Sequence, residues 1–194
     1  MIEISGQIGV DLTYDDFRAM MKDQTGDIEL MINSGGGIVH EGVGIYNTLV
    51  DYPGRITGYV NGIAASIASV IAMACDELII YDNSQMMIHK PWTVAIGNSD
   101  DFRNLIDVLD ILDEDIAKIY SEKSGQTEDA VMAAMKSETY YNAQSAVDFG
   151  LADSIKVVSR KRRQAKAELP EAVSGGMSWA SVLARASIIR SKQD

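Results

Sequence analysis

Segments with strand-like and helix-like patterns of apolar residues alternate along the chain, and this alternation most constrains how it can fold. Strand patterns occupy residues 2–8, 28–32, 55–60 and 77–81, and helical spacing occupies 12–22, 39–50 and 64–75. Strands that alternate with helices pair mostly in parallel, with each helix crossing over the sheet. The sequence therefore predicts an α/β fold, and its 194 residues suffice for one domain with a full core.

The charge of the chain is unevenly distributed. Residues 1–155 hold 25 of the 28 acidic side chains but only 8 of the 17 basic ones. An acidic body of this kind argues against binding nucleic acid over its main surface. The basic run at 160–163 would suit a polyanion or an acidic partner surface, although most such runs are simply solvated.

The last predicted strand, at 154–158, closes the domain. Beyond it, the Lys/Arg run, a proline and a Gly-Gly pair are typical of a linker. We therefore predict a domain at 1–158 and a basic, flexible tail at 159–194. The weak amphipathic pattern at 179–189 would also suit a docking helix, and the sequence leaves both readings open.

The sequence also bears on the cellular compartment of the protein and on whether it binds a metal. No charged leader followed by an apolar stretch opens the chain, and its longest apolar run, 63–75, is well short of the roughly 20 residues that a membrane span needs. Cys75 is the single cysteine, which excludes an internal disulfide, and one cysteine with two histidines cannot build the usual zinc cluster. We expect a cytoplasmic protein with no metal.

Ser66 is a candidate nucleophile. It follows the small residues Gly62-Ile-Ala-Ala and lies where a predicted strand meets a predicted buried helix. The N–H group of Ile67, in the first turn of that helix, would have no partner within the helix and could stabilise an oxyanion. Taken alone, the segment is a weak signal, because helix starts rich in alanine and serine are common and usually mean tight packing.

The glycine run Gly35-Gly-Gly37 follows a predicted strand and precedes a predicted helix. Glycines at such a place let the backbone approach a ligand and direct N–H groups into a cleft. A phosphate-binding loop is the rival interpretation. No Gly-Lys-Ser/Thr follows the glycines and their spacing is not that of a dinucleotide fingerprint, which argues against it.

Only two histidines are available as a general base. His89 ends a mostly apolar stretch that a strand would carry from the core to the rim, before Pro91 breaks the pattern. His40 lies in the first turn of a predicted helix, beside Glu41, where an ordinary surface residue is expected. We therefore favour His89 as the base.

Residues 101–123 predict one long helix with apolar residues three or four apart, namely Phe102, Leu105, Leu109, Leu112, Ile116 and Ile119. Ile106, Val108 and Ile111 lie off this seam. A lone domain would leave these three exposed, so we expect a contact between subunits there. Burial of both faces within one chain is the alternative.

Together these segments resemble the ClpP family of self-compartmentalising serine peptidases, most closely the ClpP-like head maturation proteases of phages and prophages. Asn33-Ser-Gly-Gly-Gly37 is similar to the family's Asn-Ser-Pro-Gly-Gly loop, Gly62 to Ser66 to its nucleophile motif, and Met87 to Pro91 to its histidine motif. The resemblance covers roughly residues 26–158. It implies a ClpP/crotonase-like spiral of repeated β-β-α units with a protruding handle helix.

The resemblance also implies catalytic roles. Ser66 would be the nucleophile, His89 the general base and then acid, and the N–H groups of Gly37 and Ile67 the oxyanion hole. It implies no cofactor. The substrate would be an extended polypeptide held by main-chain hydrogen bonds.

The chain departs from the family pattern at two positions within these motifs. Glu138 takes the place of the triad aspartate, and its extra methylene changes the reach of the carboxylate. Gly35 replaces the proline of the glycine loop. Of the loop residues, Gly36 and Ile38 would contact the substrate.

The implied function is ATP-independent endopeptidase cleavage by a ring-like homo-oligomer, with capsid or scaffold proteins as substrates during phage head maturation. The chain begins almost at its first predicted strand, which argues against an axial segment that engages an unfoldase. A catalytically silent scaffold subunit with the same fold is the alternative. A crotonase-type acyl-CoA enzyme is a third possibility, against which the Ser66 and His89 motifs argue.

Overall fold

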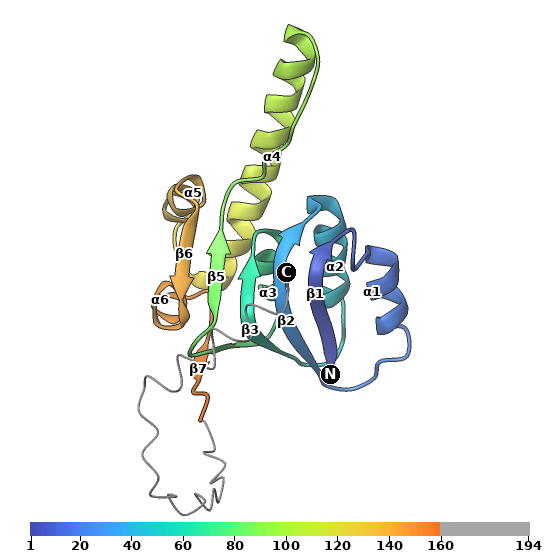
Figure 1. The fold of residues 1–194 in the computed structure, drawn as a ribbon, viewed down its shortest axis with the longest axis vertical. Helices are drawn as coiled ribbons and strands as arrows, with labels where there is room; N and C mark the ends of the chain where they lie inside the picture. The colour runs from blue at the N-terminus through green and yellow to red at the C-terminus, as the bar shows by residue number, and fades with distance from the viewer. Residues whose placement is uncertain (160–194) are drawn as a thin grey trace, which may run out of the picture. The chain divides into compact units, whose positions relative to one another are not determined.

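A computed structural model describes residues 1–159, so the predicted tail, apart from Ser159, lies outside the described residues. The strands are β1 (Ile2–Ile8), β2 (Ile28–Gly37), β3 (Ile56–Ala65), β4 (Glu77–Tyr81), β5 (Gln85–Ile88), β6 (Thr139–Asn142) and β7 (Ser154–Lys156). The helices are α1 (Tyr14–Met21), α2 (Val39–Val50), α3 (Ile67–Ala72), α4 (Ser99–Ser124), α5 (Glu128–Lys136) and α6 (Ala143–Phe149). Strands and helices alternate as far as β4, which confirms the predicted α/β fold (Figure 1).

Most of the sheet is parallel. Its strands follow the order β1-β2-β3-β4-β7, and each of these neighbours pairs in parallel. The strand β3 divides its pairing, because residues 57–60 pair with β4 whereas 63–65 pair with β5. The carboxyl ends of β2, β3 and β5 therefore meet along one edge, where parallel sheets usually place ligand and catalytic groups.

The core is a single cluster of buried apolar side chains. Isoleucine, leucine and valine residues of the parallel strands pack against Phe17 of α1, Ile45 and Leu49 of α2, and the five apolar residues of α3. The helix α3 is short and wholly buried, so it fixes the end of β3 within the core. The buried helix α3 therefore restricts the position of any side chain at the junction of β3 and α3.

The glycine run is not a loop, as the sequence suggested, but the end of a strand. The strand β2 continues through Gly37, because Gly36 and Gly37 pair with Gln7 and Ile8 of β1. A Cβ atom at Gly37 would lie 2.0 Å from the Ile8 carbonyl oxygen, so only glycine allows the two backbones to approach this closely. The helix predicted at 64–75 is also shorter, since β3 extends to Ala65 and α3 begins after Ser66.

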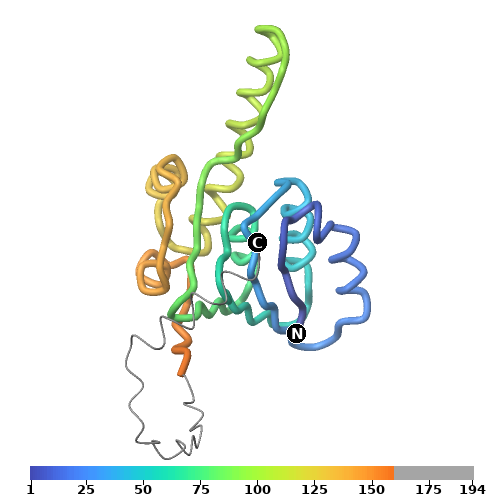
Figure 2. The backbone as a smooth tube through the Cα atoms, viewed as in Figure 1, coloured from blue at the N-terminus to red at the C-terminus, as the bar shows by residue number. Residues whose placement is uncertain are grey.

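The helix α4 stands away from the sheet over its N-terminal half (Figures 1 and 2). Asn98 and Asp101 form a capping box at its start, and Gly125, with φ of 72°, ends it in the left-handed conformation. Its buried residues all lie in the C-terminal half and are Asp113, Ile116, Ala117 and Tyr120.

No helix within residues 1–159 combines the length and apolarity that crossing a bilayer requires.

The predicted apolar seam of α4 is only partly correct. Ile106, Val108 and Ile111 are exposed, as expected, but Phe102, which belongs to the seam, is exposed too. The seam reaches the core only at Ile116, because the first half of the helix is accompanied by the β5–α4 connection and not by the sheet (Figures 1 and 2). Exposed apolar residues therefore remain on the projecting half of the helix, among them Ile106 and Ile111.

Candidate active site

Ser66 and His89 lie in direct hydrogen-bond contact. The Oγ atom of Ser66 is 2.7 Å from Nε2 of His89. Ser66 follows β3 directly and His89 follows β5 directly, so the parallel pairing of these two strands brings the side chains together. A hydroxyl that shares a proton with an imidazole at this distance can be activated as a nucleophile.

The backbone at Ser66 adopts an unusual conformation. Its φ of 55° and ψ of −133° lie outside the regions that residues with a side chain normally occupy. The turn from β3 into α3 imposes this geometry, and the Ser66 N–H group donates to the carbonyl oxygen of Met87 at 3.0 Å. A strained residue held by its surroundings at a cavity is typical of a functional site.

Gly37 belongs to the opposite wall, and Gly36 lies buried behind it. The N–H group of Gly36 donates to Ser34 Oγ, and the Ser34 hydroxyl donates to the carbonyl oxygen of Gly6 at 2.6 Å. These bonds fix the glycine segment beside β1. Gly37 and Ile38 then line the cavity that contains Ser66.

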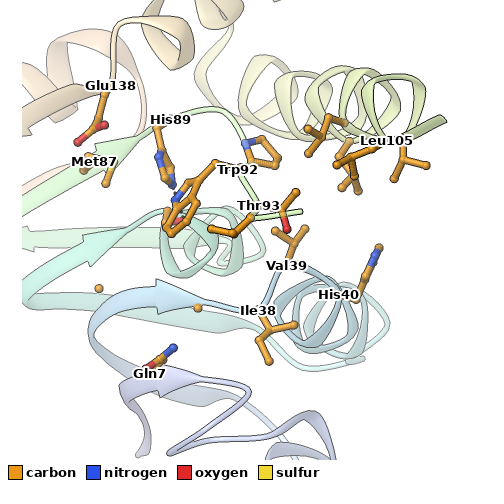
Figure 3. A pocket seen from close by; sticks show the side chains of 18 residues that line it. Gln7, Ile38, Val39, His40, Met87, His89, Trp92, Thr93, Leu105 and Glu138 are labelled. Carbon is orange, nitrogen blue, oxygen red and sulfur yellow. Dashed lines mark hydrogen bonds between the residues drawn. The ribbon is translucent and has the colours of Figure 1, made fainter. Parts of the chain in front are cut away.

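A cavity of about 1020 Å³ opens over these groups. His89 enters it from the end of β5, and Ile38 and Val39 approach from the start of α2 (Figure 3). Apolar side chains from the β5–α4 connection and from α4 complete the lining, namely Pro91, Trp92, Val94, Leu105, Val108, Leu109 and Leu112. The cavity can therefore accept apolar groups beside a polar reaction centre.

Comparison with known proteins places this geometry in a family. The Clp protease family matches residues 10–159 of the chain. The chain belongs to the Clp protease family. Within that family, it is 31% identical over 161 residues to the "ATP-dependent Clp protease proteolytic subunit" of Ligilactobacillus salivarius, an alignment that covers 80% of this chain and 82% of the relative.

Two further Clp protease relatives are similar at the same level. "ATP-dependent Clp protease proteolytic subunit 1" of Leifsonia xyli is 31% identical over 137 residues, which cover 70% of each chain. The "ATP-dependent Clp protease proteolytic subunit" of Bacteroides fragilis is 32% identical over 131 residues, which cover 66% of this chain and 63% of the relative. The predicted resemblance to the ClpP family is confirmed at the level of the family.

Glu138, the predicted acid of the triad, lines the same cavity as Ser66 and His89. It directly precedes β6, whose first residue, Thr139, pairs with Ile88 at the end of β5. Within residues 1–159, however, the hydrogen bond to the Glu138 carboxylate comes from Tyr140, at 3.5 Å, and not from His89. The structure thus brings the carboxylate to the edge of the site without completing a triad.

Two of the predicted site residues lie behind the cavity rather than in it. Gly36 is buried against Ser66, and the side chain of Ile67 points into the core with 2% of its surface exposed. Only the main chain of Ile67 is available to the site. His40 is exposed, as predicted, but it too lines the cavity.

Sequence reasoning missed several residues of the site. Gln7 reaches the cavity from β1, and Trp92 and Leu105 reach it from the β5–α4 connection and from α4 (Figure 3). No local motif marks these positions. A signal was nevertheless present for Trp92, because it follows directly on the histidine motif.

Proposed function

We propose that this chain is a serine-type endopeptidase. The observation that carries the proposal is the contact of 2.7 Å between Ser66 Oγ and His89 Nε2 at the carboxyl edge of the sheet. Membership of the Clp protease family supports it, since its relatives are named as proteolytic subunits. The silent-scaffold alternative needs neither this contact nor the strained backbone at Ser66.

The proposed reaction runs in two halves. The Ser66 oxygen bonds to the scissile carbonyl carbon while its proton passes to His89 Nε2, and His89 returns that proton to the leaving amine as the carbon–nitrogen bond breaks. Water then attacks the acyl-enzyme with His89 again as base, which releases the new carboxyl end and restores Ser66. The main-chain N–H groups of Gly37 and Ile67 stabilise the oxyanion, and one such donor is worth about 3 kcal/mol of transition-state stabilisation.

Glu138 is the proposed acid of the triad. Its place in the lining of the cavity that also holds Ser66 and His89 supports this role. A carboxylate that accepted from His89 Nδ1 would hold the ring in the tautomer that presents an unprotonated Nε2 to Ser66. A change of the Glu138 side-chain rotamer would be needed, because its carboxylate now contacts Tyr140.

The proposed substrate is an extended polypeptide. Gly36 and Ile38, at the end of β2, are the proposed contact residues. Their N–H groups already donate to Ser34 Oγ and to the Ile8 carbonyl oxygen, so Ile38 would contact the substrate through its exposed side chain. Capsid or scaffold proteins of a phage head, cleaved in the host cytoplasm, are the natural substrates we propose on the motif resemblance. Co-expression with a head gene cluster, followed by gel analysis of its capsid proteins with and without Ser66→Ala, tests that choice.

A ring-like homo-oligomer is the proposed assembly. The exposed apolar surface on the projecting half of α4, including Ile106 and Ile111, supports a subunit contact there. Cleavage without an ATPase is a separate proposal. The competing hypothesis is ATP-dependent cleavage, because the relatives are named ATP-dependent. Hydrolysis of an unfolded protein by the purified chain without nucleotide or partner would support it.

The decisive experiment labels the nucleophile. Incubation of the assembled protein with a fluorophosphonate, followed by peptide mass spectrometry, is expected to place one adduct on Ser66. Ser66→Ala should carry none, and His89→Ala should react far more slowly. Folded and assembled protein without an adduct at Ser66 would favour the silent scaffold.

A further inference from the structure

A pair of buried hydroxyl groups lies directly behind the nucleophile and has no part in the mechanism above. Ser69, on α3, is fully buried, and Tyr120, on α4, is 1% exposed. The Oγ atom of Ser69 lies 2.8 Å from the Tyr120 hydroxyl. Burial of a polar group costs free energy unless the group is hydrogen-bonded. The hydrogen-bond partners of these two hydroxyl groups therefore indicate their role.

The partners of Ser69 are two carbonyl groups that belong to the active site. Its Oγ atom is 2.6 Å from the Ser66 carbonyl oxygen and 2.8 Å from the Met87 carbonyl oxygen. The Met87 carbonyl also accepts from the Ser66 N–H group. Ser69 thus joins the main chain of the nucleophile to the strand that carries His89.

Proton counting fixes the direction of these bonds. The two carbonyl oxygens only accept, so the single proton of Ser69 must be directed to them. Tyr120 must then donate to Ser69 Oγ, because its only other acceptor within residues 1–159, the Ser66 carbonyl, is 3.5 Å away. Burial raises the pKa of Tyr120, which keeps its hydroxyl protonated and therefore a donor.

The conformation of Ser66 gives this chain of bonds a purpose. With φ of 55°, Ser66 occupies a region that its own backbone disfavours, and it persists only where the surroundings hold it. The direction of the Ser66 side chain follows from that conformation. The Ser66 carbonyl also accepts from the main-chain N–H groups of Ser69, at 2.9 Å, and Val70, at 3.4 Å, so loss of the Ser69 hydroxyl would loosen the turn, and with it the direction of Oγ, rather than release the carbonyl.

We propose that Ser69 and Tyr120 are positioning residues that hold the strained turn at Ser66, and with it the contact between Ser66 Oγ and His89 Nε2. This inference rests on the proposed function of Ser66. Tyr120 acts through the hydroxyl of Ser69, and Ser69 acts through the carbonyl groups of Ser66 and Met87. Neither residue touches the substrate.

Three variants test the inference through the second-order rate constant of Ser66 labelling by a fluorophosphonate and through peptide hydrolysis. Tyr120→Phe keeps the ring and removes only the hydroxyl, and we expect a fall of roughly 5- to 20-fold in both rates. Ser69→Ala should lower them by about 100-fold. The loss should appear in kcat, with KM unchanged, because substrate contacts remain intact.

The double variant sharpens the test. If Tyr120 acts only through Ser69, then Ser69→Ala/Tyr120→Phe should be no slower than Ser69→Ala alone. Tyr52→Phe is the matched control, since it removes a tyrosine hydroxyl that donates to the Gly26 carbonyl at 2.7 Å, in another part of the fold. Its labelling rate should equal that of the wild type.

The outcomes separate this inference from the proposed function. If wild-type protein is not labelled, the proposed function fails. If wild-type protein is labelled and both single variants react at its rate, the positioning role is overturned. If Tyr120→Phe loses more thermal stability than Tyr52→Phe, the labelling rate of Ser69→Ala decides whether the positioning role stands. If the rate losses of the two single variants multiply in the double variant, that would also count against the chain of bonds.

Discussion

Gly36 packs directly against Ser66. A Cβ atom at Gly36 would lie 2.6 Å from the Ser66 Cβ and 2.8 Å from the Ala65 carbonyl oxygen, and the φ of Gly36 is 98°. Both the space and the backbone conformation therefore require glycine here. Because the obstructing atoms belong to the nucleophile and to the main chain before it, the fit of β2 against the β3–α3 turn sets the position of the reactive hydroxyl.

Gly36→Ala should therefore damage the site more than the fold. We expect the free energy of unfolding to fall by about 1–3 kcal/mol and kcat/KM to fall by at least about 100-fold. Gly35→Ala is the matched control, because nothing lies within 4 Å of a Cβ atom there. Urea unfolding and peptide hydrolysis of both variants check this, and equal activities would contradict it.

Glu138→Gln removes the charge of the proposed triad acid but keeps its shape. Glu138 is exposed, so unfolding free energy should change by less than about 0.5 kcal/mol, whereas kcat should fall by roughly 10- to 100-fold. Glu3→Gln, another exposed glutamate, should leave kcat unchanged. Wild-type activity in Glu138→Gln would remove this residue from the mechanism.

Lys90 neutralises a buried carboxylate next to the proposed base. Its Nζ atom forms an ion pair with Oδ2 of Asp113, which is 5% exposed, and Oδ1 of Asp113 has no hydrogen-bond partner among the described residues. Lys90→Met should lower the free energy of unfolding by about 2–3 kcal/mol, because it leaves this charge unpaired. Lys90→Met/Asp113→Leu should recover most of the loss in urea unfolding, and an equally unstable double variant would contradict this explanation.

Cys75 should make stability depend on pH in the alkaline range. Burial raises the pKa of its thiol from 9.0 to about 12, so above pH 9 the unfolded chain releases a proton that the folded chain keeps. Its contribution is complete below pH 9 and is lost as pH rises toward 12. From pH 8 to 10, wild-type unfolding free energy should fall by up to about 1.4 kcal/mol more than that of Cys75→Ala. Parallel curves for the two proteins would exclude this linkage.

The projecting half of α4 should hold the assembly together. Ile106→Glu and Ile111→Glu place charges on its exposed apolar surface, so we expect smaller particles in light scattering with little change in subunit stability. Asn104→Glu adds the same charge at an exposed polar position of the helix and should assemble normally. Intact assembly in both isoleucine variants would place the subunit contact elsewhere.

The sequence by itself determined the α/β class, most of the elements and the pair Ser66 and His89. These follow from local information, since apolar periodicity specifies strands and helices, and the segments around Ser66 and His89 resemble the nucleophile and histidine motifs of the ClpP family. The strand β6 and the helix α5 were not predicted. Their segments are short, and β6 is held mainly by its pairing with β5.

Only the tertiary structure decided that the glycine run is a paired strand, that Glu138 lines the same cavity as His89 without bonding to it, and that Tyr120 reaches the nucleophile from α4. Each of these depends on the register between segments distant in the chain. Tyr120 and Ser69 are 51 residues apart, and no local pattern records such a contact. Periodicity shows which face of an element is buried, but the packing of the whole domain decides what that face meets.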